Sequence, residues 1–343
     1  MKRVLIVKMS AMGDIIHALP VSAALKDRYP HLEIVWAVEK PFAPLLEGNP
    51  CLSGIVALPK LKLRFPTAFG ALSQHMRLVR EQCGGPIDLA IDLQGLTKSA
   101  LVARASGAPV RLGYHWLREA APFLEKPVPR RPESIHIVDQ YLDVARALGA
   151  DSEVVRFPLT IPEADEAAVE QLLTEAGCSA TGFVSINPAS ARPVKEWDAS
   201  RFGALMDTLH ESVPCVLVTA DAAVAERVRA TTTRPFVNLA GRTSLKQLAG
   251  VLRRSAAHVC GDTGSGHVAA ALGTRVVSLM GPTDADRACP YGQRSSTITH
   301  HDLCGSGCDG KRCEFGAPRC MNAIEVADVK QAVINCLVVA GNL

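Results

Sequence analysis

The sequence predicts an α/β protein made of two doubly wound, parallel-sheet domains in series. Short β-rich apolar runs alternate with helical patterns along both halves of the chain, and this alternation is typical of βαβ units. A chain of 343 residues exceeds the usual size of one hydrophobic core, so two domains are expected. The composition, 48% hydrophobic and 21% charged, is that of an ordinary globular protein.

The first half begins with the apolar run VLIVK, which leads into a helical pattern near residues 14–29. A second β-rich run is followed by a helical pattern near residues 41–48, and basic connections such as 61–65 and 126–136 are interpreted as loops. The strands expected in this half are 4–8, 33–39, 54–58 and 88–95.

The second half repeats the scheme with five short strands, each ending in small or polar residues. Ligands bind at the carboxyl ends of strands in open α/β sheets, so these ends are candidate binding loops. Prolines and an acidic helix between residues 156 and 182 place the domain boundary near 160–180. We therefore expect an N-terminal domain at 1–165, a C-terminal domain at 175–325 and a final helix at 326–343. The strands expected are 183–188, 214–220, 235–241, 257–264 and 275–282.

Charge and motif content narrow the class of protein. A formal net charge of +3 is too small to indicate nucleic-acid binding, although a local basic patch could face an anionic substrate or membrane. The first apolar run is cut short by Lys8, and nothing approaches the roughly 20 apolar residues of a transmembrane helix, so we expect a cytoplasmic protein. No GxGxxG follows an early strand, which argues against a classical dehydrogenase. Two such domains in series also suit a sugar-nucleotide transferase or a periplasmic-type binding protein, and the missing signal sequence argues against the latter.

The most informative stretch is CGDTGSGHVAAALG, residues 260–273, where a strand passes through a turn into a helix. Thr263 or Ser265 can cap this helix, and two glycines would let the backbone approach a ligand. Free N–H groups at a helix start suit a phosphate. An ordinary strand-to-helix turn is the alternative for any single residue, and His267 alone would fit capping or packing. The candidate ligand residues are Asp262, Thr263, Gly264, Gly266 and His267.

Lys195 lies in the loop that follows strand 183–188, so it is expected at the same edge of the sheet as this turn. A flexible ammonium suits a leaving diphosphate, whose negative charge grows as the bond to it breaks. A solvated surface lysine explains the segment equally well.

Two junctions in the N-terminal half attract attention. Asp14, in MSAMGDIIHALP, stands where the first helix begins and can cap it. After strand 88–95, Gln94 and Lys98 lie at a second strand-to-helix junction. Together with Arg64 and the arginines at 130–131, Lys98 could receive an acidic ligand, although each basic residue singly also fits a solvated charge.

The ordered set K-x-SAMGDIIHALP, D-x-QGLxKSA, K-x-W and GDTGSGHVAAALG…GPTD resembles the heptosyltransferases of glycosyltransferase family nine, from residue 4 to about 292. The resemblance implies the GT-B fold, two Rossmann-like domains facing each other across a cleft. It implies transfer of heptose from ADP-L-glycero-β-D-manno-heptose to Kdo-lipid A or the inner core of lipopolysaccharide, with inversion and without a catalytic metal. Such an acceptor implies peripheral association with the cytoplasmic face of the inner membrane.

The resemblance also implies roles for individual residues. Asp14 becomes the general base and Lys195 the donor-phosphate contact, while residues 262–267 bind the donor. An acidic residue after the second C-terminal strand would hold the ribose, and here Glu226 and Asp221 compete. An inverting transfer needs a base opposite the leaving ADP, and Asp14 and the 262–267 turn come from different halves. The acceptor-side candidates are Arg64, Gln94 and Lys98.

Two other functions stay open. Another family nine enzyme could use a different nucleotide sugar or acceptor, such as the second core heptose or a protein; overall resemblance favours the first heptose. A nucleotide-sugar-binding protein without catalysis is the non-enzyme alternative.

Eleven cysteines are many for a cytoplasmic protein. Seven are scattered and are interpreted as small buried hydrophobes. Four cluster in 17 residues at 304–320, a density that suggests a structural tetrathiolate site for Zn or Fe, with reduced or oxidisable thiols as the alternative. The clustered residues are Cys304, Cys308, Cys313 and Cys320.

Overall fold

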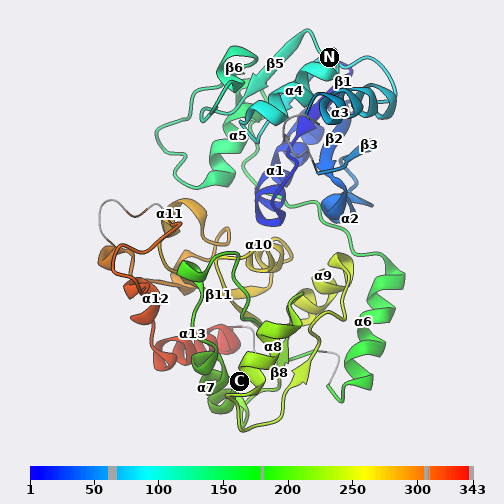
Figure 1. The fold of residues 1–343 in the computed structure, drawn as a ribbon. Helices are drawn as coiled ribbons and strands as arrows, with labels where there is room; N and C mark the ends of the chain where they lie inside the picture. The colour runs from blue at the N-terminus through cyan, green and yellow to red at the C-terminus, as the bar shows by residue number, and fades with distance from the viewer. Residues whose placement is uncertain (61–67, 179–180, 305–307, 309, 340–343) are drawn as a thin grey trace. The chain divides into compact units, whose positions relative to one another are not determined.

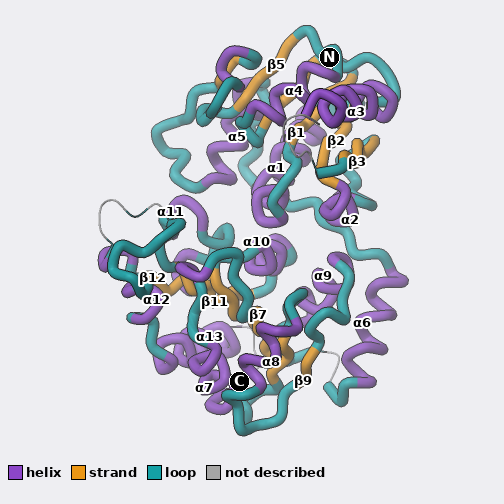
Figure 2. Tube along the Cα trace, viewed as in Figure 1, coloured by secondary structure: helices purple, strands orange, loops and turns teal. Residues whose placement is uncertain are grey.

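The computed structural model describes residues 1–60, 68–178, 181–304, 308 and 310–339. The chain divides into two compact units, Met1–Thr160 and Ile161–Leu343. Each unit has its own parallel β-sheet with helices packed on it, seen as orange strands among purple helices in Figure 2. In Figure 1 the first unit runs from blue to green and the second from green to red.

The first unit is organised around β1, whose residues Val4 to Val7 are fully buried. β1 pairs with β2 on one side and β4 on the other, so Val4 lies opposite both Ile34 and Leu89. The sheet has six parallel strands in the order β3-β2-β1-β4-β5-β6. Their bounds are β1 Arg3–Val7, β2 Glu33–Glu39, β3 Gly54–Leu58, β4 Leu89–Asp92, β5 Val110–Gly113 and β6 Lys126–Pro127.

The helices of this unit begin where the strands end. α1 starts at Met12, carries Asp14 in its first turn and basic residues in its last, as the helix dipole favours, and packs against α5. The expectation of a loop over 126–136 was wrong at its start, because β6 forms there. The expected loop at 61–65 lies outside the described residues. The helices are α1 Met12–Arg28, α2 Ala43–Leu46, α3 Ala68–Gln82, α4 Thr97–Ala105 and α5 Ile137–Ala147.

The second unit repeats the architecture with strand order β12-β11-β10-β7-β8-β9, all parallel. β10 lies at the centre and is buried throughout. All five expected strands are present, and β12 is an additional strand. Their bounds are β7 Val184–Asn187, β8 Cys215–Leu217, β9 Val237–Asn238, β10 Ala257–Gly261, β11 Arg275–Met280 and β12 Thr297–Thr299.

Some helices of the second unit pack against elements that are adjacent in the sequence, and others pack against distant elements. Glu166 of α6 is 3.0 Å from Arg254 of α9, so the acidic helix predicted near the boundary belongs to this unit. Val329 and Val333 of α13 enter the same core as α7 and β11. The helices are α6 Glu163–Glu175, α7 Ala199–Leu209, α8 Ala222–Arg229, α9 Leu245–Arg254, α10 Gly264–Ala271, α11 Ala285–Ala288, α12 Arg319–Asn322 and α13 Val326–Val339.

No helix in the described ranges combines the length and the apolarity needed to cross a membrane.

Candidate active site

The turn after β10 joins a buried strand to the start of α10. Thr263 occupies the N-cap position, but its hydroxyl lies 3.0 Å from that of Ser265 and accepts no bond from the helix backbone. The N–H group of Gly266 bonds to the Cys260 thiol, so the N–H groups of Gly264 and Ser265, at the helix start, are the ones that could bind an anion. The expected strand-to-helix turn is formed, although neither expected hydroxyl caps the helix through its side chain, and its phosphate role stays a prediction.

Lys195 and Asp262 form an ion pair at this turn. The Lys195 ammonium, at the end of a 3-10 turn Pro193–Lys195, lies 2.5 Å from Asp262 Oδ2. Thr283, after β11, donates its hydroxyl to the same oxygen at 2.6 Å. Burial tends to raise the pKa of Asp262, but the charge and hydrogen bond of Lys195 and the Thr283 hydroxyl outweigh burial and hold the pKa below its ordinary value. Lys195 is thus held at the turn.

A buried chain of polar side chains supports the turn from inside the unit. Ser255 donates to Ser185 at 2.8 Å, and Ser185 meets His258 Nδ1 at 2.9 Å. His258 Nε2 is 3.0 Å from the Ser265 hydroxyl, which also accepts from Asn187 at 2.9 Å. Burial lowers the pKa of His258 to about 3, so the ring is neutral at physiological pH. This series of hydrogen bonds fixes Ser265, and with it the first turn of α10.

Gly266 serves packing more directly than ligand approach. A Cβ at this position would lie 2.7 Å from Cys260 Sγ, so the missing side chain lets α10 pack against its own strand. His267, also in the first turn, is buried, and it is close enough to Asp262 to help lower the pKa of that carboxyl. Asp284, which follows Thr283, caps α11 by accepting from the backbone of Asp286 and Arg287.

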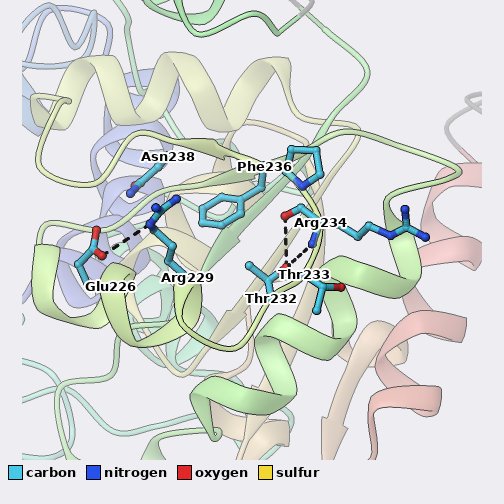
Figure 3. Close-up of a pocket in the computed structure, with 8 residues that line it drawn as sticks. Glu226, Arg229, Thr232, Thr233, Arg234, Phe236 and Asn238 are labelled. Carbon is cyan, nitrogen blue, oxygen red and sulfur yellow. Dashed lines mark hydrogen bonds and ion pairs between the residues drawn. The ribbon is translucent and has the colours of Figure 1, made fainter.

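Glu226 lies on α8 and lines a cavity of about 580 Å³ between this helix and β9. Figure 3 shows Glu226 beside Arg229, to which it is ion-paired at 3.8 Å, with Asn238 and the ring of Phe236 on the same cavity. The competing residue, Asp221, uses its carboxylate to cap α8 through Ala223 and Val224. Glu226 therefore has the freer carboxylate of the two, and the ribose role remains a prediction.

Asp14 occupies the third helical position of α1. Its Oδ2 accepts from the Ala11 backbone N–H at 3.3 Å and so contributes one hydrogen bond to the helix start, while Ala11 has no side-chain acceptor that could complete a capping box. Its side chain is partly exposed. Lys8, just after β1, is buried and donates to the Leu93 carbonyl at 2.9 Å and to the Tyr141 hydroxyl at 2.7 Å. Burial lowers the pKa of Lys8, while the charges of Asp14 and other anionic groups oppose this.

The side chain of Gln94 is hydrogen-bonded to the backbone of the loop that leads to Asp14. Its Oε1 accepts from the N–H groups of Met9 and Ser10, both at 3.2 Å. The turn that carries it is organised by buried Asp92, which accepts from the N–H of Gln94 at 2.7 Å and of Gly95 at 3.1 Å. Gly95 has φ +69°, and a Cβ there would lie 2.6 Å from a backbone oxygen, so only glycine fits.

The basic acceptor-side candidates have different surroundings. Lys98 is ion-paired with Glu39 at 3.2 Å and is about one quarter exposed. Arg131 pairs with Asp151 at 3.4 Å. Arg64 lies outside the described residues. Thus Gln94 and Lys98 belong to one junction after β4, and no described contact brings Arg131 to it.

The cysteine prediction divides into two outcomes. The seven scattered cysteines are all buried, as predicted. The clustered Cys304, Cys308, Cys313 and Cys320 line one small cavity with free thiols, and burial together with the neighbouring thiols raises the pKa of Cys304 to about 12. Within the described ranges, no set of three or more His, Cys, Asp or Glu side chains has a geometry able to hold a metal ion. The predicted structural Zn or Fe site is therefore not supported.

Several residues that contact the turn at 94–99 or the turn before α10 were not predicted from the sequence. Asp92, Glu125 and Lys8 lie around the 94–99 turn, whereas His258 and Asn187 lie beneath the α10 turn. A polar residue inside an apolar strand, such as His258 in AHVCG, is the one signal available, because a buried polar group needs a partner. The partner itself is distant in sequence.

Similarity to known proteins can now be added to this geometry. A family model described as glycosyltransferase family 9 (heptosyltransferase) matches residues 75–317, more than half of the chain. The chain belongs to this family. It is accordingly a glycosyltransferase, as the motif resemblance implied.

Three related proteins agree with this assignment. Lipopolysaccharide heptosyltransferase 1 of Pseudomonas aeruginosa is 28% identical over 317 residues, covering 91% of this chain and 88% of the relative. The solved structure of a family 9 glycosyl transferase from Veillonella parvula has a TM-score of 0.86 at 21% identity, covering 98% and 97% of the two chains. E. coli ADP-heptose lps heptosyltransferase II has a TM-score of 0.79 at 22% identity and 99% coverage of each chain. These structures show the fold, and they confirm the predicted GT-B class.

The neutral, buried state of His258 predicts a pH-dependent stability. Its folded pKa of about 3 lies below the unfolded value of about 6.5, so the unfolded chain binds the extra proton between these values. The free energy of unfolding should fall as the pH drops through this window, with a contribution of up to about 1.4 kcal/mol per pH unit. Urea unfolding at several pH values would measure it.

His258→Gln should remove this contribution and flatten the acid slope, whereas His31→Gln, at an exposed histidine, should leave the slope unchanged. Equal slopes for the wild type and His258→Gln would contradict a buried neutral histidine.

Proposed function

We propose that this enzyme transfers heptose from ADP-L-glycero-β-D-manno-heptose to the Kdo/inner-core region of lipopolysaccharide, with inversion at the anomeric carbon. Membership of a heptosyltransferase family supports heptose transfer in general. The observation that carries the specific proposal is the Lys195–Asp262–Thr283 cluster at the start of α10. It places a cation beside the start of a helix, where backbone N–H groups favour an anion, and this combination suits the binding of a diphosphate.

On the donor side, the leaving ADP gains negative charge as the bond between the anomeric carbon and the phosphate oxygen breaks. Lys195 is held beside the turn by Asp262, so little reorganisation is needed to meet this charge. Thr263, Gly264 and His267 would contact the donor from the same turn, with Glu226 proposed for the ribose. Gly266 is proposed to let the donor approach the turn because it has no side chain, while its own N–H group bonds to the Cys260 thiol.

On the acceptor side, Asp14 would accept the proton of the attacking hydroxyl as the new bond to the anomeric carbon forms. The electron pair of the broken bond stays on the ADP phosphate. Asp14 suits this role because its carboxylate is partly exposed and is oriented by the Ala11 N–H. Lys98 and Arg64 would attract the acidic acceptor, with Gln94 fixing the loop that carries the base.

The acceptor and the place of work follow from the same proposal. A membrane-anchored lipid acceptor would bring the enzyme to the cytoplasmic face of the inner membrane as a peripheral protein. The named relatives include lipopolysaccharide heptosyltransferases 1 and II, so addition of the second heptose is the alternative. ADP-heptose should be offered with Kdo-lipid A and with heptosylated core in parallel. Transfer to Kdo-lipid A alone supports the proposal, and transfer to heptosylated core alone supports the alternative.

Asp14→Asn should lower kcat by about 10²–10⁴-fold, because the amide keeps the helix-start hydrogen bond but cannot take a proton at neutral pH. ADP affinity, measured by calorimetry, should stay within a few-fold, because the nucleotide contacts are proposed for the other unit. Asp198→Asn, at a carboxylate that caps α7, is the matched control. Unchanged turnover of Asp14→Asn would refute the base assignment.

Lys195→Ala should weaken ADP-heptose binding and lower kcat about 10²-fold or more, because the ammonium opposes the charge of the leaving group. Steady-state kinetics and calorimetry with ADP measure the two effects, with Lys330→Ala on α13 as a lysine control in the same unit. A change in acceptor KM alone would contradict the role proposed for Lys195.

A further inference from the structure

A second carboxyl group lies against Asp92 in the first unit. Glu125, immediately before β6, is 6% exposed, and it lies within hydrogen-bonding range of the Asp92 carboxyl, which is fully buried. Neither Glu125 oxygen has a hydrogen-bond partner from an N–H or hydroxyl group of the described residues. Two buried carboxylates cannot remain in contact unless a proton lies between them.

The proton belongs on Glu125. Asp92 accepts three hydrogen bonds, from the backbone of Gln94 and Gly95 and from the Ser99 hydroxyl at 2.6 Å, and these favour its ionised form. Glu125 has no comparable donors. Burial, followed by the neighbouring Asp92, raises the pKa of Glu125 to about 10, against the opposing charge of Arg111. Glu125 is therefore a carboxylic acid that donates to Asp92.

This pair is connected to Asp14 by a short series of hydrogen bonds. Asp92 holds the turn that carries Gln94, and Gln94 Oε1 accepts from the N–H groups of Met9 and Ser10. The next residue, Ala11, donates to Asp14 Oδ2. A change in the Asp92 turn is thus transmitted through Gln94 to the loop at the start of α1.

We propose that Glu125 is a positioning residue, which donates a hydrogen bond to Asp92 and so fixes the loop that orients Asp14. The inference rests on the proposed role of Asp14 as the base. Glu125 touches no reacting group in this scheme. Its effect is to keep the turn after β4 in one arrangement while the reaction proceeds.

Deprotonation of Glu125 should loosen the loop at alkaline pH. The charged or titratable groups around the pair are Lys8 after β1, Arg111 on β5, and the groups that act on Lys8, which are Asp14, Tyr114, Arg118 and Tyr141. The folded pKa of Glu125 lies above its unfolded value of about 4.3. The folded chain therefore holds the extra proton, and stability falls as the pH rises from about 4.3 to about 10. A glutamine can donate the same hydrogen bond without titrating.

The decisive comparison is Glu125→Gln against Glu125→Leu, with Glu133→Gln as an exposed control from the same segment. Hydrogen exchange should show amides of residues 9–14 exchanging at least about tenfold faster in Glu125→Leu than in the wild type. kcat should fall at least about tenfold with donor KM within twofold, since a misplaced base slows only the chemical step. Glu125→Gln should match the wild type at neutral pH in both measurements.

Above pH 8, Glu125→Gln should retain a larger share of its neutral-pH activity and stability than the wild type. Wild-type protection in Glu125→Leu, or exchange in Glu125→Gln as fast as in Glu125→Leu, would overturn the proposal. If Glu125→Leu does not fold, the pH dependence of unfolding in Glu125→Gln decides, and a curve parallel to the wild type overturns it. The exchange experiment needs no substrate, so it tests Glu125 even if heptose transfer itself is not found.

Discussion

A carboxylate that is largely or wholly buried at the end of a central strand must be satisfied, and in each unit this requirement organises the candidate site. Asp262 follows β10 and is satisfied by Lys195 and Thr283, which come from the loops after β7 and β11. Asp92 ends β4 and is satisfied by its own turn, by Ser99 and by the Glu125 carboxyl. Because an unpaired buried charge costs several kcal/mol, these side chains cannot rearrange independently.

The two carboxylates organise their surroundings differently. Asp262 holds the flexible side chain of Lys195 close to helix N–H groups that favour an anion. Asp92 acts on backbone and, through Gln94, on the loop before α1. In the proposed reaction, the arrangement around Asp262 stabilises the negative charge of the leaving ADP. The arrangement around Asp92 orients Asp14, the group that takes the proton. Both arrangements are preorganised before any substrate binds, which is where electrostatic catalysis gains most.

The sequence predicted the architecture well because the fold depends on local patterns. Runs such as VLIVK and AHVCG are long and apolar enough to identify central strands. The strands that were missed, β5, β6 and β12, are short and flank the sheets, where only a few residues are buried. The turn residues 262–267 were also predictable, since glycine, threonine and aspartate after a strand carry their own signal.

Other features of the sites were beyond the sequence for physical reasons. Glu125 contacts Asp92 across 33 positions, and His258 reaches Ser185 across 73, so no local pattern links them. Gly266 was expected to let a ligand approach, but the absence of its side chain also leaves the space that Cys260 occupies. The four cysteines are densely clustered in the sequence, but the described thiols lack a metal-binding arrangement. Spacing alone does not determine where side chains point.

The central claim, that a carboxylate and a lysine in different units drive an inverting heptose transfer, can be tested on the product. The linkage formed from ADP-L-glycero-β-D-manno-heptose and Kdo-lipid A should be analysed by NMR for its anomeric configuration. Direct attack assisted by one base predicts an α-linked heptose from the β-linked donor. A β-linked product would contradict the account, because retention requires a second displacement or a different mechanism. Transfer only from another nucleotide sugar would contradict the assigned donor.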